Sequence, residues 1–442
     1  MASVILLAVQ AITALICNVK EPEPFHWEHN PLYLLPTILV VEAGVSSEVS
    51  TPRPILPLET SRLEEAGGDP VYATAIATAT AENSDAQYLL DHCRCPKCFH
   101  PVTKQRLKSL FEFPANVQPA NVRATQDGIE VTWQTADGHS SSFPLSFLAR
   151  ASYDPPLTPP EANDQALENN ADDRRILWNS TIGQSPPSVQ YESLMKTSTT
   201  DNTVLGLLDK VHDYGFCFIH NVPPTPEDNG GFWDFTSNMS HGDLAYSTEG
   251  LPAHTDTTYF TDPAGLQIFH LLSHPPPGTG GTTLLVDAFY TAALLETLQP
   301  TLYDVLSRLR IPCHASGTPG TLMRPPLSQP VLRHDENGRL IQVRWNNEDR
   351  GVLGQAWQAE DVGAWYRAAR CFEELLRSPD AEYWVQLSPG TMIVIDNWRV
   401  MHGRSAFTGS RRMCGAYVGA DDWRSRRAAL RNGKLDNWQV GW

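Results

Sequence analysis

Short apolar runs, bounded by Gly and Pro, recur along the C-terminal part of the chain and predict buried strands. Six of them are rich in β-branched and aromatic residues: GFCFIHNV (215–222), AGLQIFHLL (264–272), TTLLVDAF (282–289), RLIQVRW (339–345), TMIVIDNW (391–398) and RMCGAYVG (412–419). Apolar residues three and four apart over 290–309 and 364–378 predict helices. This pattern indicates a mainly β domain with flanking helices, a double-stranded β-helix (jelly roll) whose helices pack outside a pair of sheets.

A smaller region, residues 86–152, precedes this domain and also predicts strands. GIEVTW (128–133) and SSSFPLSFL (140–148) alternate apolar and polar residues, and the Gly-containing turn QTADGH (134–139) joins them as a hairpin. A region of this size builds only a small core, which needs support from a metal or a disulfide.

Three cysteines and one histidine of the smaller region are candidate metal ligands. Cys93, Cys95 and Cys98 have the C-x-C-x-x-C spacing with which thiolates surround one soft cation. His139, in the hairpin turn, is the candidate fourth ligand of a closed Cys3His zinc site, which would be structural because no position is left for a substrate. Reduced buried cysteines beside an exposed turn histidine are the alternative.

Two tracts, residues 20 to about 85 and 153–175, are Pro-rich and have no sustained period. They predict a disordered or mispredicted leader over residues 1–85 and an acidic linker over 153–175. The leader opens on the apolar run ASVILLAVQAITALIC, for which a signal segment, a buried helix and a mispredicted first exon all stay open. Because a spanning helix needs about 20 apolar residues, no stable membrane span is expected. The larger domain then covers residues 176–442.

The net charge of −17, from 33 basic and 50 acidic side chains, argues against attraction to phosphate backbones or anionic lipids, so nucleic acid is not an expected partner. Eight cysteines in 442 residues, three of them clustered, do not indicate a disulfide scaffold. A reducing compartment is therefore expected.

In the stretch LPAHTDTTYF, a single residue separates His254 from Asp256. The two are either metal ligands or polar residues of a turn. A non-haem Fe(II) site needs two histidines and one carboxylate on one face of the metal. The second histidine is found in VIDNWRVMHGR, where His402 follows a buried strand and precedes Gly403, and Arg411 stands at the start of the next strand. This combination is much less common than any of its parts and favours an iron site.

These residues carry a resemblance to the γ-butyrobetaine/trimethyllysine dioxygenase family of Fe(II)/2-oxoglutarate-dependent oxygenases. The phrases HTDTTYF, GGTTLLVDAFY, DNWRVMHGR and FTGSRRMCGAY are similar to that family, and the likeness runs over roughly residues 85–430. The family has an N-terminal Cys3His zinc module, onto which Cys93, Cys95, Cys98 and His139 match.

The resemblance implies a role for each matching residue. His254, Asp256 and His402 would be the catalytic iron ligands, Arg411 would bind the distal carboxylate of 2-oxoglutarate, and Thr283 would hydrogen-bond this co-substrate. A quaternary ammonium substrate cannot donate a hydrogen bond and is held by aromatic faces. The residues that match such an aromatic cage are Trp233, Tyr246 and Tyr417, and Asn346 is the candidate for the amino-acid end of the substrate.

One departure from the family lies before Gly230, where the chain lacks a helix and a strand, so that Asn229 falls at a cage-tyrosine position. A missing strand would expose a sheet edge and core surface. A mis-spliced gene and a catalytically impaired paralogue are the two explanations.

The activity implied is hydroxylation of Nε-trimethyllysine at C3 in carnitine biosynthesis, with γ-butyrobetaine as the alternative substrate. The cofactors and partners implied are Fe(II), 2-oxoglutarate, O2, ascorbate and structural Zn(II). Family members are commonly homodimers and are mitochondrial in animals, whereas this leader is acidic and not Arg-rich, unlike a transit peptide. Mitochondrial and cytoplasmic locations therefore both stay open.

Overall fold

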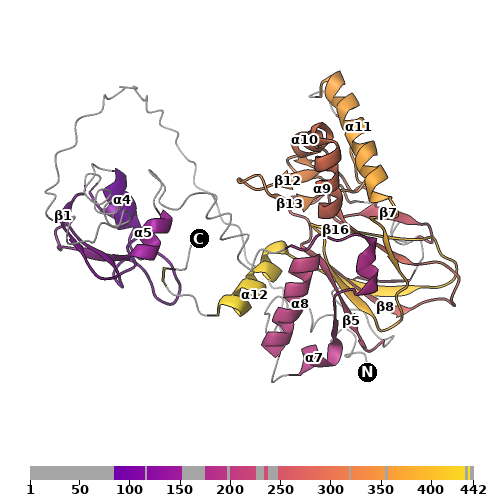
Figure 1. Ribbon diagram of the computed structural model, residues 1–442, viewed down its shortest axis with the longest axis horizontal. Coiled ribbons are helices and arrows are strands. Elements are labelled where there is room, and N and C mark those ends of the chain that lie inside the picture. Colours follow the sequence, from indigo (N-terminus) through magenta and orange to yellow (C-terminus); the bar gives the residue numbers. More distant parts are fainter. Residues whose placement is uncertain are drawn as a thin grey trace. The chain divides into compact units, whose positions relative to one another are not determined.

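The computed structural model describes residues 84–114, 117–151, 175–196, 200–224, 233–236, 247–317, 320–353, 357–433 and 437–438. The apolar run at 2–17 and nearly all of the expected leader and linker lie outside these residues. The described residues form two compact units, 84–151 with 437–438, and 175–433 (Figure 1). None of the helices in the described part of the chain is both long enough and apolar enough to cross a membrane.

The smaller unit is a three-stranded antiparallel sheet with short helices. Its elements are α4 (Ser84–Asp91), η1 (Leu110–Glu112), β1 (Pro119–Ala124), β2 (Gly128–Trp133), β3 (Ser140–Pro144) and α5 (Leu145–Ala151). The strand order is β1-β2-β3, and Thr132 pairs with Ser140 across the predicted hairpin turn. Leu89, Trp133 and Phe143 lie in its core, so the buried faces of α4 and the sheet cover each other.

The segment SSSFPLSFL differs from its prediction, because only its first half is a strand. β3 ends at Pro144, and α5 begins at Leu145 and buries Phe147, Leu148 and Ala151. Proline has no backbone N–H for a further ladder bond, and its fixed φ suits the start of a helix. The apolar residues of this segment therefore belong to two elements, the strand β3 and the helix α5.

Two residues near the C-terminus, Asn437 and Trp438, belong to the smaller unit, although composition placed residues 176–442 in the larger domain. The Trp438 ring lies 4.9 Å from that of Phe147 and 5.9 Å from that of Phe143. Lys104 Nζ donates to Asn437 Oδ1 at 2.7 Å. These contacts add an aromatic side chain to a small core.

Replacing Trp438 by alanine is expected to destabilise the smaller unit by about 2 kcal/mol, since it removes two aromatic contacts and leaves a cavity. Hydrogen exchange of the amides of β2 and β3 in the full chain measures this loss. Trp384→Ala, at a half-exposed position of the larger unit, is the matched control and should leave those amides unchanged. Equal protection in the parent and in Trp438→Ala would contradict the expectation.

The larger unit is built on two sheets. The six-stranded sheet has the order β4 (Ser188–Gln190), β5 (Phe216–His220), β15 (Met392–Asp396), β8 (Leu266–Ser273), β17 (Arg412–Val418) and β6 (Trp233–Thr236). The four-stranded sheet has the order β14 (Tyr383–Val385), β9 (Thr283–Asp287), β16 (Val400–Arg404) and β7 (Leu251–His254). All neighbours are antiparallel except β4 and β5. Five of the six predicted strands lie in these sheets.

The sixth predicted strand, RLIQVRW, forms β13 (Leu340–Val343) outside the two sheets, in a hairpin with β12 (Leu332–His334). A further short pair joins β10 (Arg310–Ile311) and β11 (Gln329–Pro330). The remaining short element is η2 (Ser180–Gln184). Apolar patterning thus predicted that a strand forms at 340–343 and did not indicate which strand it pairs with.

Helices cover the outer face of each sheet. The helices are α7 (Tyr191–Met195), α8 (Thr200–Tyr214), α9 (Ala288–Leu298), α10 (Pro300–Arg308), α11 (Ala359–Leu376) and α12 (Ala420–Asn432). One core cluster joins α7, α8 and α12 to the six-stranded sheet, and a second joins α9, α10 and α11 to the four-stranded sheet (Figure 1). A third cluster, including Leu271, Leu285 and Ile393, fills the space between the sheets. The predicted arrangement of helices outside a sheet pair is the one observed.

The helix predicted over 290–309 is interrupted, so that α9 and α10 are separate. Gln299 between them has φ −145° and ψ 64°, outside the helical region. Pro300 causes the break, because its ring disfavours a helical residue before it and it cannot donate to a preceding turn. Pro300 is instead the first residue of α10.

Candidate functional site

The three candidate iron ligands meet at the end of the four-stranded sheet. His254 is the last residue of β7, Asp256 follows it by two residues, and His402 lies in β16. The antiparallel register places His402 directly opposite His254. Gly403 allows this close approach, because a Cβ there would lie 2.6 Å from the Leu251 carbonyl oxygen. The close packing of β7 against β16 therefore explains why a glycine follows His402.

The donor atoms of these residues have the spacing that one metal ion needs. Asp256 Oδ1 lies 3.3 Å from His254 Nε2 and 3.6 Å from His402 Nε2, and the three ligand atoms lie within 4.8 Å of one another. Ligands that bind a transition metal at about 2.1 Å and at right angles are separated by about 3 Å. The two histidines and the carboxylate fit a metal at this point.

Neighbouring groups orient the donors and set their charge. The His254 ring contacts the Pro252 carbonyl oxygen through Nδ1 at 2.8 Å, which directs Nε2 toward Asp256. Burial lowers the pKa of His402 to about 4, so that its ring is neutral at pH 7. For Asp256, burial acts to raise the pKa, but His402, His254 and Tyr417 together hold it below its usual value. Asp256 is thus ionised and His402 neutral, which are the forms in which a carboxylate and an imidazole bind metal.

Tyr417, a predicted cage residue, lies beside this cluster. Its hydroxyl donates to Asp256 Oδ2 at 2.9 Å. Trp233 pairs by its backbone with Gly415, two residues from Tyr417 along β17, while its side chain and all of Tyr246 lie outside the described residues. Burial and the charge of Asp256 raise the pKa of Tyr417, which keeps the hydroxyl protonated. Of the predicted cage, the structure thus places one side chain, within hydrogen-bonding distance of a candidate iron ligand.

Arg411 is a buried cation near the same sheets. Its side chain is 4% exposed, its Nε has no hydrogen-bond partner within the described part of the chain, and it lies over the Phe407 ring. Burial, and then the charge of Arg404, lower its pKa to about 10, so it stays protonated at pH 7. A buried guanidinium with an unused donor fits an anionic ligand such as a carboxylate.

Thr283 and Arg404 lie opposite each other in neighbouring strands. Thr283 is the first residue of β9 and is buried, and the register pairs it with Arg404 of β16. Arg404 Nη2 donates to the carbonyl oxygens of Ser247 and Glu249 at 2.8 and 3.0 Å. Arg404 was not among the residues predicted from the sequence, although it stands two positions after His402 and therefore shares a strand face with it.

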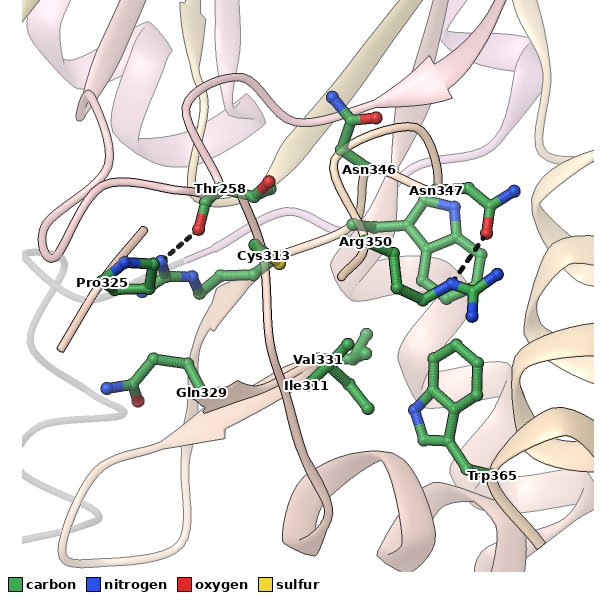
Figure 2. A pocket seen from close by; sticks show the side chains of 12 residues that line it. Thr258, Ile311, Cys313, Pro325, Gln329, Val331, Asn346, Asn347, Arg350 and Trp365 are labelled. Atoms are coloured by element: carbon green, nitrogen blue, oxygen red, sulfur yellow. Dashed lines mark hydrogen bonds between the residues drawn. The ribbon is translucent and has the colours of Figure 1, made fainter. Parts of the chain in front are cut away.

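Asn346 lines a pocket next to β13 and α11. Figure 2 shows its amide pointing away from the other lining side chains, among which are Thr258, Arg350 and Trp365. The Asn346 side-chain oxygen accepts from the Glu348 backbone N–H at 3.1 Å. Arg350 Nε donates to Asn347 Oδ1 at 3.3 Å. Asn346 thus stabilises a turn through its side-chain oxygen.

The four candidate zinc ligands come together in the smaller unit. His139 Nε2 lies 3.5, 3.9 and 3.4 Å from the sulfur atoms of Cys93, Cys95 and Cys98. Tetrahedral zinc, with bonds of about 2.3 Å to sulfur and 2.05 Å to nitrogen, separates these atoms by about 3.6 Å. His139 is buried rather than exposed, which favours the zinc interpretation over the turn-histidine alternative.

Comparison with known proteins places the chain among its relatives. Residues 208–417 match the family described as taurine catabolism dioxygenase TauD, TfdA family, and residues 77–149 match the γ-butyrobetaine hydroxylase-like N-terminal family. Trimethyllysine dioxygenase of Neurospora crassa is 39% identical over 389 residues, which cover 77% of this chain and 79% of the relative. The enzyme so named from Meyerozyma guilliermondii is 36% identical, with coverage of 79% and 91%. The human mitochondrial enzyme is 35% identical, with coverage of 78% and 82%.

These relatives match both units of the chain, and they confirm the resemblance drawn from the motifs around His254, His402 and Arg411. The chain belongs to the trimethyllysine dioxygenase family.

Proposed function

We propose that this protein hydroxylates Nε-trimethyllysine at C3 in an Fe(II)- and 2-oxoglutarate-dependent reaction, a step of carnitine biosynthesis. The observation that carries the proposal is the convergence of His254, Asp256 and His402, whose donor atoms lie within 4.8 Å, in a chain of this family. The two helix-covered sheets support the double-stranded β-helix expected for such enzymes.

The iron would be held by His254 Nε2, His402 Nε2 and Asp256 Oδ1. When bound, the metal supplies the oxidation, in which 2-oxoglutarate and O2 are converted to succinate and CO2 and one oxygen atom enters the substrate as a hydroxyl. Arg411 would bind the distal carboxylate of 2-oxoglutarate with its guanidinium fork, and Thr283 would donate a hydrogen bond to the same co-substrate. The Phe407 ring, which lies against the Arg411 guanidinium, would help to exclude water from this charge pair.

The trimethylammonium group would lie against aromatic rings, each worth about 0.5–2 kcal/mol. Tyr417 is held beside the metal position by its bond to Asp256. Residues directly opposite in a sheet share a face, as do residues two apart along a strand, so Trp233 and Tyr417 are positions on one face. Tyr246 completes the proposed cage, and Asn346 would bind the amino-acid end through its amide N–H groups.

Succinate formation by the purified full chain with Fe(II), 2-oxoglutarate and ascorbate tests the proposal. The expected result is turnover stimulated by trimethyllysine, weaker stimulation by γ-butyrobetaine, and none by unmethylated lysine, which has a hydrated ammonium and fits an aromatic cage poorly. His254→Ala, the matched control, should abolish turnover. Stronger stimulation by γ-butyrobetaine would assign that compound as the substrate instead.

The segment before Gly230, where the chain departs from the family, lies outside the described residues, and so does Asn229. The strand that follows them, β6, pairs with β17 at the edge of the six-stranded sheet. If folded, iron-loaded protein showed no turnover with any substrate, the impaired paralogue would replace the active enzyme as the proposed function.

A structural Zn(II) held by Cys93, Cys95, Cys98 and His139 is part of the proposal. Replacing Cys98 by serine is expected to remove the metal and to unfold much of the smaller unit, because metal-binding energy in such small domains is also folding energy. Metal analysis of the purified chain should fall from one zinc per chain to none, with loss of amide protection in β2 and β3. Cys371→Ser, a half-buried cysteine of α11, is the control. Retention of stoichiometric zinc by Cys98→Ser would reject this ligand set.

A mitochondrial location and a homodimer complete the proposal. The human and chicken relatives are named as mitochondrial enzymes, which supports the first of the two locations left open by the leader. Fractionation of cells that express the full chain tests the location, and sedimentation of the purified protein tests the dimer.

A further inference from the structure

The segment that follows His254 is held in place by one buried side chain from a distant part of the sequence. We propose that Asn397 is a positioning residue that holds Asp256 in the orientation for metal binding. The inference rests on the proposed function, because it assigns Asp256 to the iron. Asn397 lies in the turn between β15 and β16 and is 1% exposed.

The Asn397 amide binds both backbone groups of Asp256. Its Oδ1 accepts from the Asp256 N–H at 2.8 Å, and its Nδ2 donates to the Asp256 carbonyl oxygen at 3.0 Å. Nδ2 also donates to the Ala264 carbonyl oxygen at 2.9 Å. These three bonds join one end of the 256–264 loop to the other. A carboxylate at position 397 has similar size and keeps the acceptor, but it would face two carbonyl oxygens without a proton to share.

The backbone conformation of the residue after Asp256 shows why these hydrogen bonds are needed. Thr257 has φ +57°, a left-handed conformation that a β-branched residue adopts only when its surroundings impose it. Its hydroxyl donates to the Asp256 carbonyl oxygen at 2.8 Å and accepts from the Ala264 N–H at 3.0 Å. Asn397 and Thr257 thus bridge the same two residues, and Asn397, which binds both backbone groups of Asp256, sets the direction in which the Asp256 carboxylate points.

The position of Asn397 also couples the two halves of the metal site. The turn that carries it leads directly into β16 and His402. Its own backbone N–H donates to the Gly265 carbonyl oxygen at 2.9 Å, and Trp398 Nε1 donates to that of Pro263 at 3.1 Å. One rigid turn therefore fixes the loop of Asp256 relative to the strand of His402. Groups that orient metal ligands in this way change metal affinity by about 10- to 100-fold when they are replaced.

The test is a titration of the zinc-loaded full chain with Co(II), well below the unfolding temperature, reading visible absorption bands that are absent in His254→Ala. In Asn397→Asp, we expect the Co(II) dissociation constant to rise by about 10- to 100-fold, with altered bands. Asn397→Ser, which keeps one of the bonds, should show a smaller rise. Asn179→Ala is the matched control, since that side chain also makes three hydrogen bonds in the larger unit, two with Thr181 and one with Asp380.

The outcomes separate the inference from the proposed function. If the parent showed no His254-dependent Co(II) bands, the proposed iron site would fail. If the parent bound Co(II) and folded Asn397→Asp bound it equally well, only the role of Asn397 would fail. Thr257→Gly, in which glycine adopts the left-handed φ without strain, should stay close to the parent. Loss of metal in Thr257→Gly alone, or unfolding of both Asn397 variants, would overturn the inference in favour of Thr257 or of a general role in stability.

Discussion

Replacing Arg411 by methionine is expected to raise the apparent KM for 2-oxoglutarate by about 100- to 1,000-fold, because it leaves a carboxylate buried without its partner. Such a loss corresponds to about 3–4 kcal/mol. Arg411 is buried and its Nε has no hydrogen-bond partner among the described residues, so its guanidinium is a desolvated cation that suits an anionic ligand. Methionine keeps a long unbranched apolar side chain at this position and removes the charge.

Initial rates of succinate formation at varied 2-oxoglutarate measure this effect. Arg411→Lys separates charge from shape, because it keeps a cation but loses the planar fork, and should lie between the parent and Arg411→Met. Arg324→Met, at an exposed position, is the control. An unchanged KM in Arg411→Met, with Fe(II) bound normally, would show that another residue binds the co-substrate.

Replacing Arg399 by methionine is expected to lower the free energy of unfolding of the larger unit by about 3–5 kcal/mol, because it leaves the Asp287 charge buried and unpaired. The two side chains are 1% and 0% exposed, and Arg399 Nη2 lies 2.8 Å from Asp287 Oδ2. Arg399 also donates to the carbonyl oxygens of Asp213 and Ile176, at 2.9 and 2.6 Å. The pair thus connects α8, β9 and the turn before β16.

Urea unfolding followed by the near-UV signal of the larger unit measures this loss. Arg377→Met breaks a long, exposed helical pair with Glu373 and should change stability by less than about 0.5 kcal/mol. Asp287→Asn is expected to be destabilising as well, since the carboxylate also accepts from the Phe289 N–H at the start of α9. A change in Arg399→Met no larger than in Arg377→Met would indicate that the unpaired carboxylate is readily hydrated.

Much of the candidate site could be predicted because its ligands are close in sequence or carry a distinctive neighbour. His254 and Asp256 are two residues apart, and the three zinc-site cysteines lie within six residues, so local geometry already brings them near each other. Gly403 helped to identify His402 as a candidate ligand, because only glycine tolerates the close approach of β7 to β16 at this position. Arg404 and Asn397 were not predicted, because their bonds to Ser247, Glu249 and Asp256 are long-range contacts, although the place of Arg404 two residues after His402 was a local signal for it.

The positions of strands were predicted more reliably than the ends of helices or the pairing of strands. Runs such as TMIVIDNW are buried on both faces, and only a central strand satisfies such a run without exposing it. Pro144 and Pro300 altered the elements around them through the missing N–H, a local effect that apolar periodicity does not report. RLIQVRW formed a strand as predicted, yet it paired outside the two main sheets, since pairing depends on what the rest of the chain places beside it.

Residue types and short spacings were enough to predict the family, the kinds of candidate ligand and most of the strands. Which of these groups meet depends on how the chain folds. The pairing of β7 with β16 sets His402 opposite His254, and the turn before β16 brings Asn397, 141 positions along the chain, to the backbone of Asp256. A metal site needs donors within a few ångströms of one another, whereas apolar patterning indicates which face of a strand is buried and not which strands are neighbours.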